Sequence, residues 1–309
     1  MSLDSKNPFA AVSTLEYEMP PFALIKDEHY LPAFYGGMEE QLTEVDAIIA
    51  QPEVTFENTF VALEKSGRTL LRVALVFFNK SSSDTSDVLD AIEEEIAPKL
   101  AAHSDAIKLN PQLWSRIEKI YNERATLDLG SEELRLVELY YKDFHFAGAH
   151  LNAEARVELK TLNEELSKLE AEFSRKVLAD TNDSAIIVDS IEELAGLSDN
   201  EIAAAKLAAE TRGHDDKWLI KAVNFSGNPM LATLTNRPLR EKIMRASLMR
   251  ANRGNENDTK SVLVAMTQLR ARRATLFGVK SHAEYITGEN TAKSPENIHA
   301  MPARSQNLP

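Results

Sequence analysis

Residues 159–173 read LKTLNEELSKLEAEF, a stretch in which apolar side chains recur every three or four positions. The apolar residues are Leu159, Leu162, Leu166, Leu169 and Phe173. This spacing places them on one face of an α-helix, and charged residues such as Glu164 and Lys168 fill the other faces. The sequence therefore predicts a long helix over about residues 150–180, whose narrow apolar seam is typical of one helix in an antiparallel helical hairpin.

Most of the remaining chain shows the same helical periodicity. A single apolar stripe runs from Phe60 to Phe77, and another runs through 131–150. Asn110 followed by Pro111 is a typical helix start, because Asn caps the first turn and Pro is tolerated at the first helical position. The other predicted helices cover about residues 84–100, 111–124, 200–211, 238–250 and 258–277.

Two short runs interrupt this helical pattern. They read SAIIVDS (184–190) and KWLIKAV (217–223), and both are rich in the β-branched and aromatic residues that favour strands. The sequence thus predicts an all-α fold with long antiparallel helices and a small β-hairpin-like patch near 184–223. It further predicts an N-terminal helical domain over 1–183, followed by the β patch and more helices over 184–309.

The composition is that of a globular protein. Of the 309 residues, 43% are hydrophobic and 27% are charged, which does not fit a disordered chain. The absence of cysteine excludes disulfides, thiolate metal sites and a cysteine nucleophile, and it fits a reducing cytoplasm. We expect no membrane span, because no apolar run is long enough, and no signal peptide, because the N-terminus lacks a basic region before an apolar core.

The net charge of −13 is unevenly distributed. Residues 1–200 carry a balance of −20, and residues 201–309 carry a balance of +7. The acidic majority argues against a nucleic-acid partner, whose phosphates require Lys and Arg. The basic final third could face an acidic partner, a peptide carboxylate or the rest of the molecule.

The segment DFHFAGAH (143–150) raises the question of a metal site. His145 and His150 are five positions apart, and on a continuous helix this separates their directions by about 140°. They therefore should not bind one ion, and we interpret them as surface or boundary residues. The remaining histidines are isolated in the sequence, and none begins an H-E-x-x-H motif. They are His29, His103, His214, His282 and His299, of which His214 lies in a predicted solvated turn beside Asp215 and Asp216.

Other catalytic patterns are also missing from the sequence. It contains no G-x-G-x-x-G, no Walker phosphate loop and no G-x-S-x-G elbow. Pairs of neighbouring carboxylates are better explained as solvated helix surface. A basic run near a predicted helix C-terminus, where cations suit the helix dipole, is better explained as structural or interfacial. These residues are Glu93 and Glu95, Glu132 and Glu133, Glu164 and Glu165, and Arg270, Arg272 and Arg273. The residues alone predict no catalytic, cofactor-binding or metal-binding residue in this chain.

A series of short segments nevertheless carries a resemblance to a known family. In order they are NPF (7–9), HYLPAFYGGM (29–38), NTFVALEKSG (58–67), VFF (76–78), RLVELYYKDFHFAGAHL (135–151), DDKWLIKAVN (215–224), NRPLREKIMRASLMRANRG (236–254), NDTKSVLVAMTQLRARRATLFG (257–278) and SPEN (294–297). This succession resembles the N-terminal half of the thimet-oligopeptidase family of zinc metallopeptidases, above all its bacterial peptidyl-dipeptidases, with the oligopeptidases A as near relatives. The resemblance covers about residues 7–298.

The resemblance implies a helical body with a deep channel that admits short peptides. The peptidyl-dipeptidases of the family release dipeptides from the C-terminus of such peptides. The family's zinc ligands and glutamate base belong to its C-terminal half, and none maps onto a position here. The resemblance therefore implies that DFHFAGAH is a helix end and that this chain alone is non-catalytic. The alternative is a stand-alone, non-catalytic helical binding or interaction protein.

The end of the chain departs from the family pattern. The tail MPARSQNLP places Pro302 where the family helix should continue, and proline removes a backbone donor and clashes with the preceding turn. We therefore expect the helix to be interrupted there, in a chain truncated before the catalytic domain. A missing second half would leave apolar residues of 255–309 uncovered, including Leu263, Met266 and Leu269, and we expect self-association through that face.

Overall fold

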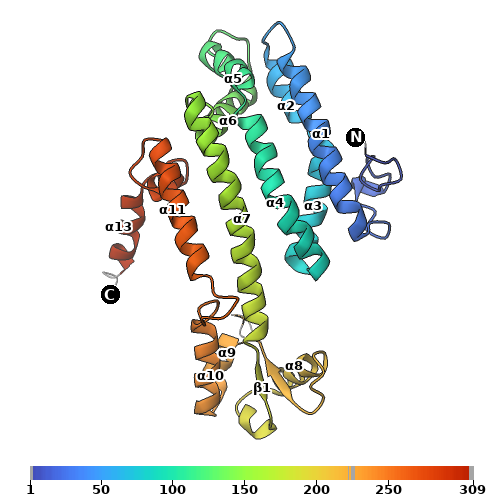
Figure 1. Ribbon diagram of the computed structural model, residues 1–309, viewed down its shortest axis with the longest axis vertical. Coiled ribbons are helices and arrows are strands. Elements are labelled where there is room, and N and C mark those ends of the chain that lie inside the picture. Colours follow the sequence, from blue (N-terminus) through green and yellow to red (C-terminus); the bar gives the residue numbers. More distant parts are fainter. Residues whose placement is uncertain (1–2, 222, 224–226, 306–309) are drawn as a thin grey trace. The chain divides into compact units, whose positions relative to one another are not determined.

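The computed structural model describes residues 3–221, 223 and 227–305 (Figure 1). The described chain is mainly helical, with a two-stranded antiparallel sheet, so the predicted fold class is confirmed. It divides into two compact units: unit 1 comprises residues 1–168 and 268–309, and unit 2 comprises residues 169–267. The predicted domain boundary between residues 183 and 184 stays a prediction.

Unit 1 contains most of the long helices. Its elements are the 3₁₀ turns η1 (Glu16–Glu18) and η2 (Asp27–His29), the helices α1 (Tyr30–Ile49), α2 (Ala62–Lys65), α3 (Arg68–Ser83), α4 (Asp87–Lys108), α5 (Pro111–Glu123) and α6 (Ser131–Ala147), the π-helical turn η3 (Glu57–Val61), and α12 (His282–Thr287) and α13 (Pro295–Ser305) near the C-terminus. Two further helices, α7 (Ala153–Asp183) and α11 (Lys260–Leu276), have one end in each unit.

Unit 2 is built around the small sheet. Its other elements are β1 (Ile186–Val188), the 3₁₀ turn η4 (Ile191–Leu194), α8 (Asp199–Glu210), β2 (Trp218–Ile220), α9 (Gly227–Thr233) and α10 (Arg237–Leu248). The two strands are antiparallel, with Ile186 opposite Ile220 and Val188 opposite Trp218. Both predicted β runs therefore form strands that pair with each other. Of the second run, residue 222 lies outside the described residues.

The long helix predicted from the apolar seam is α7. Leu159, Leu162 and Leu166 are buried, whereas Leu169 and Phe173 are half-buried. The Asn152 side chain accepts a hydrogen bond from the backbone of the first turn of α7, at 2.8 Å. The predicted start of α5 is also confirmed, because Asn110 accepts from two backbone N–H groups of its first turn.

The predicted single stripe over 60–77 is wrong, because the chain breaks at Gly67. This residue has φ 68°, a left-handed conformation that glycine adopts without the strain a side chain would add. The break separates α2 from α3. As a result, Phe60 joins one hydrophobic cluster and Phe77 joins another.

Unit 1 thus has two apolar cores. One gathers residues of α1, η3, α5 and α6 around Phe60, Leu113 and Phe144. The other gathers residues of α1, α3 and α4 around Phe34 and Phe77, whose rings meet edge to face at 5.3 Å. The three helices of this second core lie side by side in Figure 1. A third core, in unit 2, joins the sheet to η4, α9 and α10.

The predicted interruption at Pro302 is also wrong. Helix α13 spans Pro295–Ser305 and runs through position 302. Proline removes one backbone hydrogen bond, and neighbouring turns can retain theirs. Helix α4 accommodates Pro98 within its span in the same way.

Candidate functional site

The DFHFAGAH segment forms the end of α6 and the turn into α7. Helix α6 ends at Ala147, and Gly148 adopts φ 104° and donates to the carbonyls of Phe144 and His145. The reversal brings the rings of His145 and His150 into a parallel stack, with centroids 3.8 Å apart and planes at 7°. The separation of about 140° expected on a continuous helix does not apply, because α6 ends before His150, as the resemblance implied.

The stacked pair does not have the geometry of a metal site. In parallel rings the in-plane nitrogen lone pairs run side by side and do not converge on one ion. Burial, followed by the neighbouring His145, lowers the pKa of His150, which favours its neutral form. Throughout residues 3–221, 223 and 227–305, no group of three His, Cys, Asp or Glu side chains is placed to hold a metal.

The histidine pair belongs to a row of aromatic rings in unit 1, of which some neighbours are stacked and others tilted. The row joins α5, α6, the α6–α7 turn, the residue after α11, and α12 by centroid distances between 3.6 and 6.0 Å. Its members are Tyr121, Tyr141, His145, His150, Phe277 and Tyr285. The hydroxyl of Tyr285 also donates to the Phe146 carbonyl at 2.8 Å, so the row fixes α12 against the end of α6.

The other histidines have separate roles. His103 is buried in α4, where its Nε2 lies 2.7 Å from Gln41 Oε1 and burial lowers its pKa. His29 accepts a hydrogen bond from the Lys26 backbone through Nδ1. His214 lies half-buried in the turn after α8 and donates its backbone N–H to Ala209. His282 begins α12, and His299 is exposed on α13.

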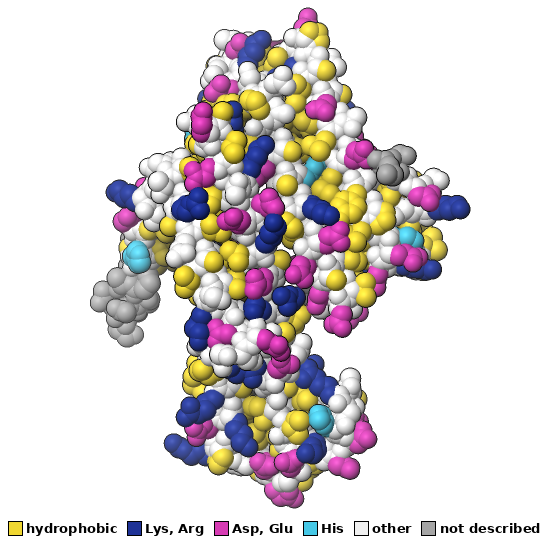
Figure 2. All heavy atoms as spheres, in the orientation of Figure 1, with side chains coloured by type: hydrophobic (Ala, Val, Ile, Leu, Met, Phe, Trp, Pro, Cys, Tyr) yellow, Lys and Arg dark blue, Asp and Glu magenta, His cyan; other side chains and the backbone are white. Residues whose placement is uncertain are grey.

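The predicted surface carboxylates and basic run make local contacts. Glu93 accepts from Ser81, Glu95 accepts from Tyr35 and Lys99, and Glu133 accepts from the backbone N–H of Gly130 at the start of α6. Glu164 pairs with Lys168, and Arg272 pairs with Glu158 at 3.0 Å. Arg273 lies over the ring of Tyr285. Figure 2 shows acidic and basic side chains intermixed over the visible face, and the paired Arg272 fits the predicted structural role of the basic run.

Sequence reasoning missed a buried carboxylate in unit 1. Asp105 of α4 is 8% exposed. Its two carboxylate oxygens, Oδ1 and Oδ2, both accept hydrogen bonds from Asn163 Nδ2 of α7, at 2.9 and 3.0 Å. Burial raises the pKa of Asp105, although Asn163 and nearby cations partly oppose this. In the sequence Asp105 looks like any polar residue of an amphipathic helix, and only the contact with α7 distinguishes it.

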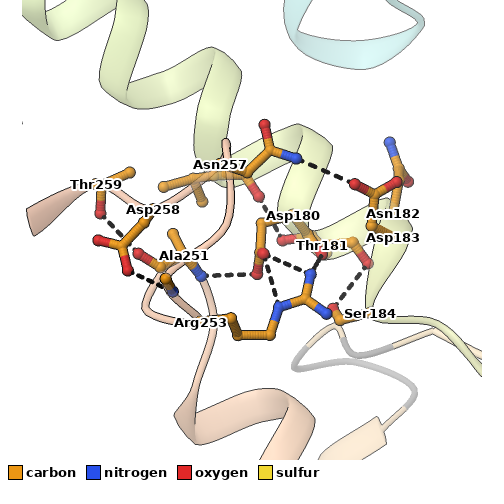
Figure 3. A network of polar contacts seen from close by, with 12 residues as sticks. Asp180, Thr181, Asn182, Asp183, Ser184, Ala251, Arg253, Asn257, Asp258 and Thr259 are labelled. Atoms are coloured by element: carbon orange, nitrogen blue, oxygen red, sulfur yellow. Dashed lines mark hydrogen bonds and ion pairs between the residues drawn. The ribbon is translucent and has the colours of Figure 1, made fainter.

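A second missed feature is the polar network of unit 2 in Figure 3, which we call the Asp180 clamp (Asp180, Ala251, Arg253). Asp180, at 0% exposure on α7, accepts from the Ala251 N–H at 2.7 Å and from Arg253 Nε at 2.8 Å. Arg253 also donates to the Asp180 carbonyl. The clamp therefore holds the segment after α10 against α7, and it fixes Ala251 at the uncommon φ of 53°.

Side chains of the same segment form hydrogen bonds with the backbone just before the start of α11. Asp258 accepts from the backbone N–H groups of Gly254 and Lys260, and these bonds lower its pKa to about 2. Asn257 donates to Asp183 at 3.0 Å, and Thr259 donates to the Ala251 carbonyl. The sequence signal was the segment RANRGNENDTK (250–260), whose polar residues satisfy the backbone of this connection.

No helix in the described part of the chain has the length and apolar character to cross a membrane.

Comparisons with known proteins point to a peptidase family. No protein-family model matches the chain. The chain is 38% identical over 295 residues to the dipeptidyl carboxypeptidase of Escherichia coli, which covers 95% of this chain and 43% of that protein. It is 37% identical to the dipeptidyl carboxypeptidase of Salmonella typhimurium, covering 94% of this chain and 43% of that protein. It is 26% identical to oligopeptidase A of Haemophilus influenzae, covering 91% of this chain and 42% of that protein.

The chain thus spans less than half the length of the curated relatives that it matches, although the match runs along nearly all of its own length. The order of its matching segments, its helical fold and these identities agree. The chain is therefore similar, along nearly all of its own length, to part of the dipeptidyl carboxypeptidases and oligopeptidases A, in agreement with the resemblance seen in its sequence.

Proposed function

We propose that this chain is the N-terminal, substrate-channel part of a peptidyl-dipeptidase that releases C-terminal dipeptides from short peptides. The supporting observation is the 38% identity to a dipeptidyl carboxypeptidase over 95% of this chain. The helical fold and the position of the matching segments agree with this role. A reducing compartment suits a chain without cysteine, and a cytoplasmic location is part of the proposal.

We further propose that the chain alone does not catalyse hydrolysis. A catalytic zinc needs three protein ligands and an open position for water. The described residues do not fit such an ion, because the two histidines whose rings meet are stacked in parallel, and the sequence has no H-E-x-x-H motif. In this proposal the zinc and its glutamate base are supplied by a catalytic part with which this chain associates.

A complementation experiment tests the proposal directly. The chain is joined to the part of E. coli dipeptidyl carboxypeptidase that it does not match, and release of C-terminal dipeptides from a quenched peptide is measured. We expect activity from the joined protein and none from either part alone. A joined protein that folds and binds zinc without cleaving the peptide contradicts the proposed role.

The isolated chain provides the complementary test. Zinc titration and the same quenched-peptide assay should both be negative. Stoichiometric zinc binding together with cleavage that a chelator abolishes refutes the non-catalytic assignment.

The alternative is a stand-alone helical interaction protein. Its supporting observation is a set of exposed apolar side chains in 255–309, namely Leu263, Val264, Ile298 and Met301. Met266 is buried, contrary to its predicted exposure, and Leu269 is half-buried. The genomic sequence directly downstream separates the two functions, because an H-E-x-x-H segment there supports the peptidase.

We also propose that 255–309 is a surface for self-association. Hydrogen exchange on the chain, with its oligomeric state measured in parallel, tests this. If 255–280 exchanges as slowly as the long helix in a monodisperse monomer, the proposed surface is wrong.

A further inference from the structure

A pocket of about 260 Å³ lies between the N-terminal segment and α3 in unit 1. Its walls are largely apolar, with Phe9, Val12 and Tyr17 from the N-terminal segment and Leu75 and Val76 from α3. Three prolines, Pro8, Pro20 and Pro21, complete much of the rest. The volume is slightly below the range of pockets for drug-sized ligands, so it suits a smaller molecule.

Two side chains of opposite charge line this pocket. Arg72 of α3 is anchored through Nη2, which donates to the Phe9 carbonyl at 3.1 Å and to Thr69 Oγ1 at 3.0 Å. Its Nη1 has no hydrogen-bond partner among the described residues, although a guanidinium can donate five hydrogen bonds. The guanidinium is therefore held in place by one end and has donors to spare.

Glu18 is the second charged residue of the lining, and it is exposed. Within the described chain, neither Glu18 nor Arg72 has an ion-pair partner, so the two charges do not neutralise each other. Tyr17 and Glu18 both have φ 56°, a left-handed conformation that residues with side chains rarely adopt. Such backbone outliers cluster at ligand-binding segments.

Three large hydrophobic side chains of the pocket lining, Val12, Tyr17 and Leu75, are exposed to solvent. Monomeric proteins rarely expose a large contiguous apolar surface without a binding role.

We propose that this pocket binds a small zwitterion with apolar side chains, such as an apolar dipeptide or free amino acid. The ligand carboxylate accepts hydrogen bonds from Arg72, its ammonium pairs with Glu18, and its side chain occupies the apolar part of the pocket. Charge complementarity supports this occupant, because the pocket offers one positive and one negative group on otherwise apolar walls. The site does not depend on the proposed peptidase function, since it is tested by binding alone.

The first test compares three ligands on the unaltered chain by isothermal titration calorimetry. Leu-Leu carries both charges, N-acetyl-Leu-Leu lacks the ammonium, and Leu-Leu-amide lacks the carboxylate. We expect Leu-Leu to bind about fivefold more tightly than either analogue, which corresponds to one partly exposed ion pair in each case. Equal affinity for all three ligands, or no binding of Leu-Leu, overturns the proposal.

The second test uses a matched pair of variants. Glu18→Gln should weaken Leu-Leu binding about fivefold and leave N-acetyl-Leu-Leu binding unchanged. Glu16→Gln is the control, because Glu16 is an exposed acid of the same turn that does not line the pocket. An identical response of the two variants refutes the role of Glu18. Arg72→Met should selectively weaken ligands with a free carboxylate, and if it does not fold, the comparison of ligands on the unaltered chain still decides.

Discussion

Removing the carboxylate of the Asp180 clamp should destabilise unit 2 strongly. Asp180→Ala removes the acceptor of a buried backbone N–H and the partner of Arg253 at once. An orphaned buried donor costs about 1–3 kcal/mol, and breaking a buried ion pair costs about 3–5 kcal/mol. The Arg253 side chain is 30% exposed, so water compensates part of its lost pairing. We therefore expect a loss of about 3 kcal/mol in the free energy of unfolding of unit 2.

Urea unfolding followed by tryptophan fluorescence measures this loss. Trp218 lies in unit 2 and Trp114 in unit 1, so a Trp114→Phe background makes the signal specific for unit 2. Asp216→Asn is the control, because Asp216 is an exposed acid of the same unit, and it should change stability by less than about 0.5 kcal/mol. A loss below about 1 kcal/mol for Asp180→Ala refutes the clamp.

A double variant separates the two contributions. Adding Arg253→Met to Asp180→Ala removes the uncompensated charge and leaves the orphaned Ala251 N–H. The double variant should therefore recover part of the lost stability. If it is as unstable as the sum of the two single variants, the two side chains are not coupled.

Three further changes should test the packing and the titration of unit 1. Burial raises the pKa of Asp105. The contribution of this carboxyl to stability is therefore fully present below its unfolded pKa and is lost as the pH rises through the raised, folded-state pKa. Asp105→Asn should make the chain more stable near pH 7, and urea unfolding at several pH values should show a smaller pH dependence than in the unaltered chain. The pKa of His150 is lowered, so its contribution to stability is present above about pH 6.5 and is lost as the pH falls through the lowered, folded-state pKa. His150→Gln should therefore reduce the loss of stability at acid pH. Histidine NMR titration of the unaltered chain should show the lowered pKa directly. Gly148→Ala should destabilise by about 2 kcal/mol or more, because its Cβ would lie 2.6 Å from Leu159 at φ 104°. Thermal unfolding measures this loss, and the control is Gly278→Ala in unit 1, at φ 69° with nothing within 4 Å, which should show only the smaller conformational cost.

Much of the secondary structure could be predicted because helix and strand signals are local. The period of apolar residues in α7, the Asn110–Pro111 start of α5 and the two β-branched runs each act within a few positions of the chain. The stripe over 60–77 misled because the periodicity continues across Gly67 while the backbone does not. A single glycine at a positive φ there redirects the chain and assigns its two halves to different cores.

The pairings that distinguish this molecule were decided only in three dimensions. His145 and His150 stack because Gly148 reverses the chain between them, Asp105 meets Asn163 across two helices, and Asp180 meets Arg253 at a separation of 73 positions. In the sequence such residues are indistinguishable from solvated polar side chains, because burial and hydrogen bonding between distant segments leave no periodic trace. By itself the sequence determined the helical class, the absence of cysteine and of an H-E-x-x-H motif, and the family resemblance. Which polar groups become buried, paired or shifted in pKa depends on tertiary packing, since desolvation and Coulomb interactions follow distance in space and not distance along the chain.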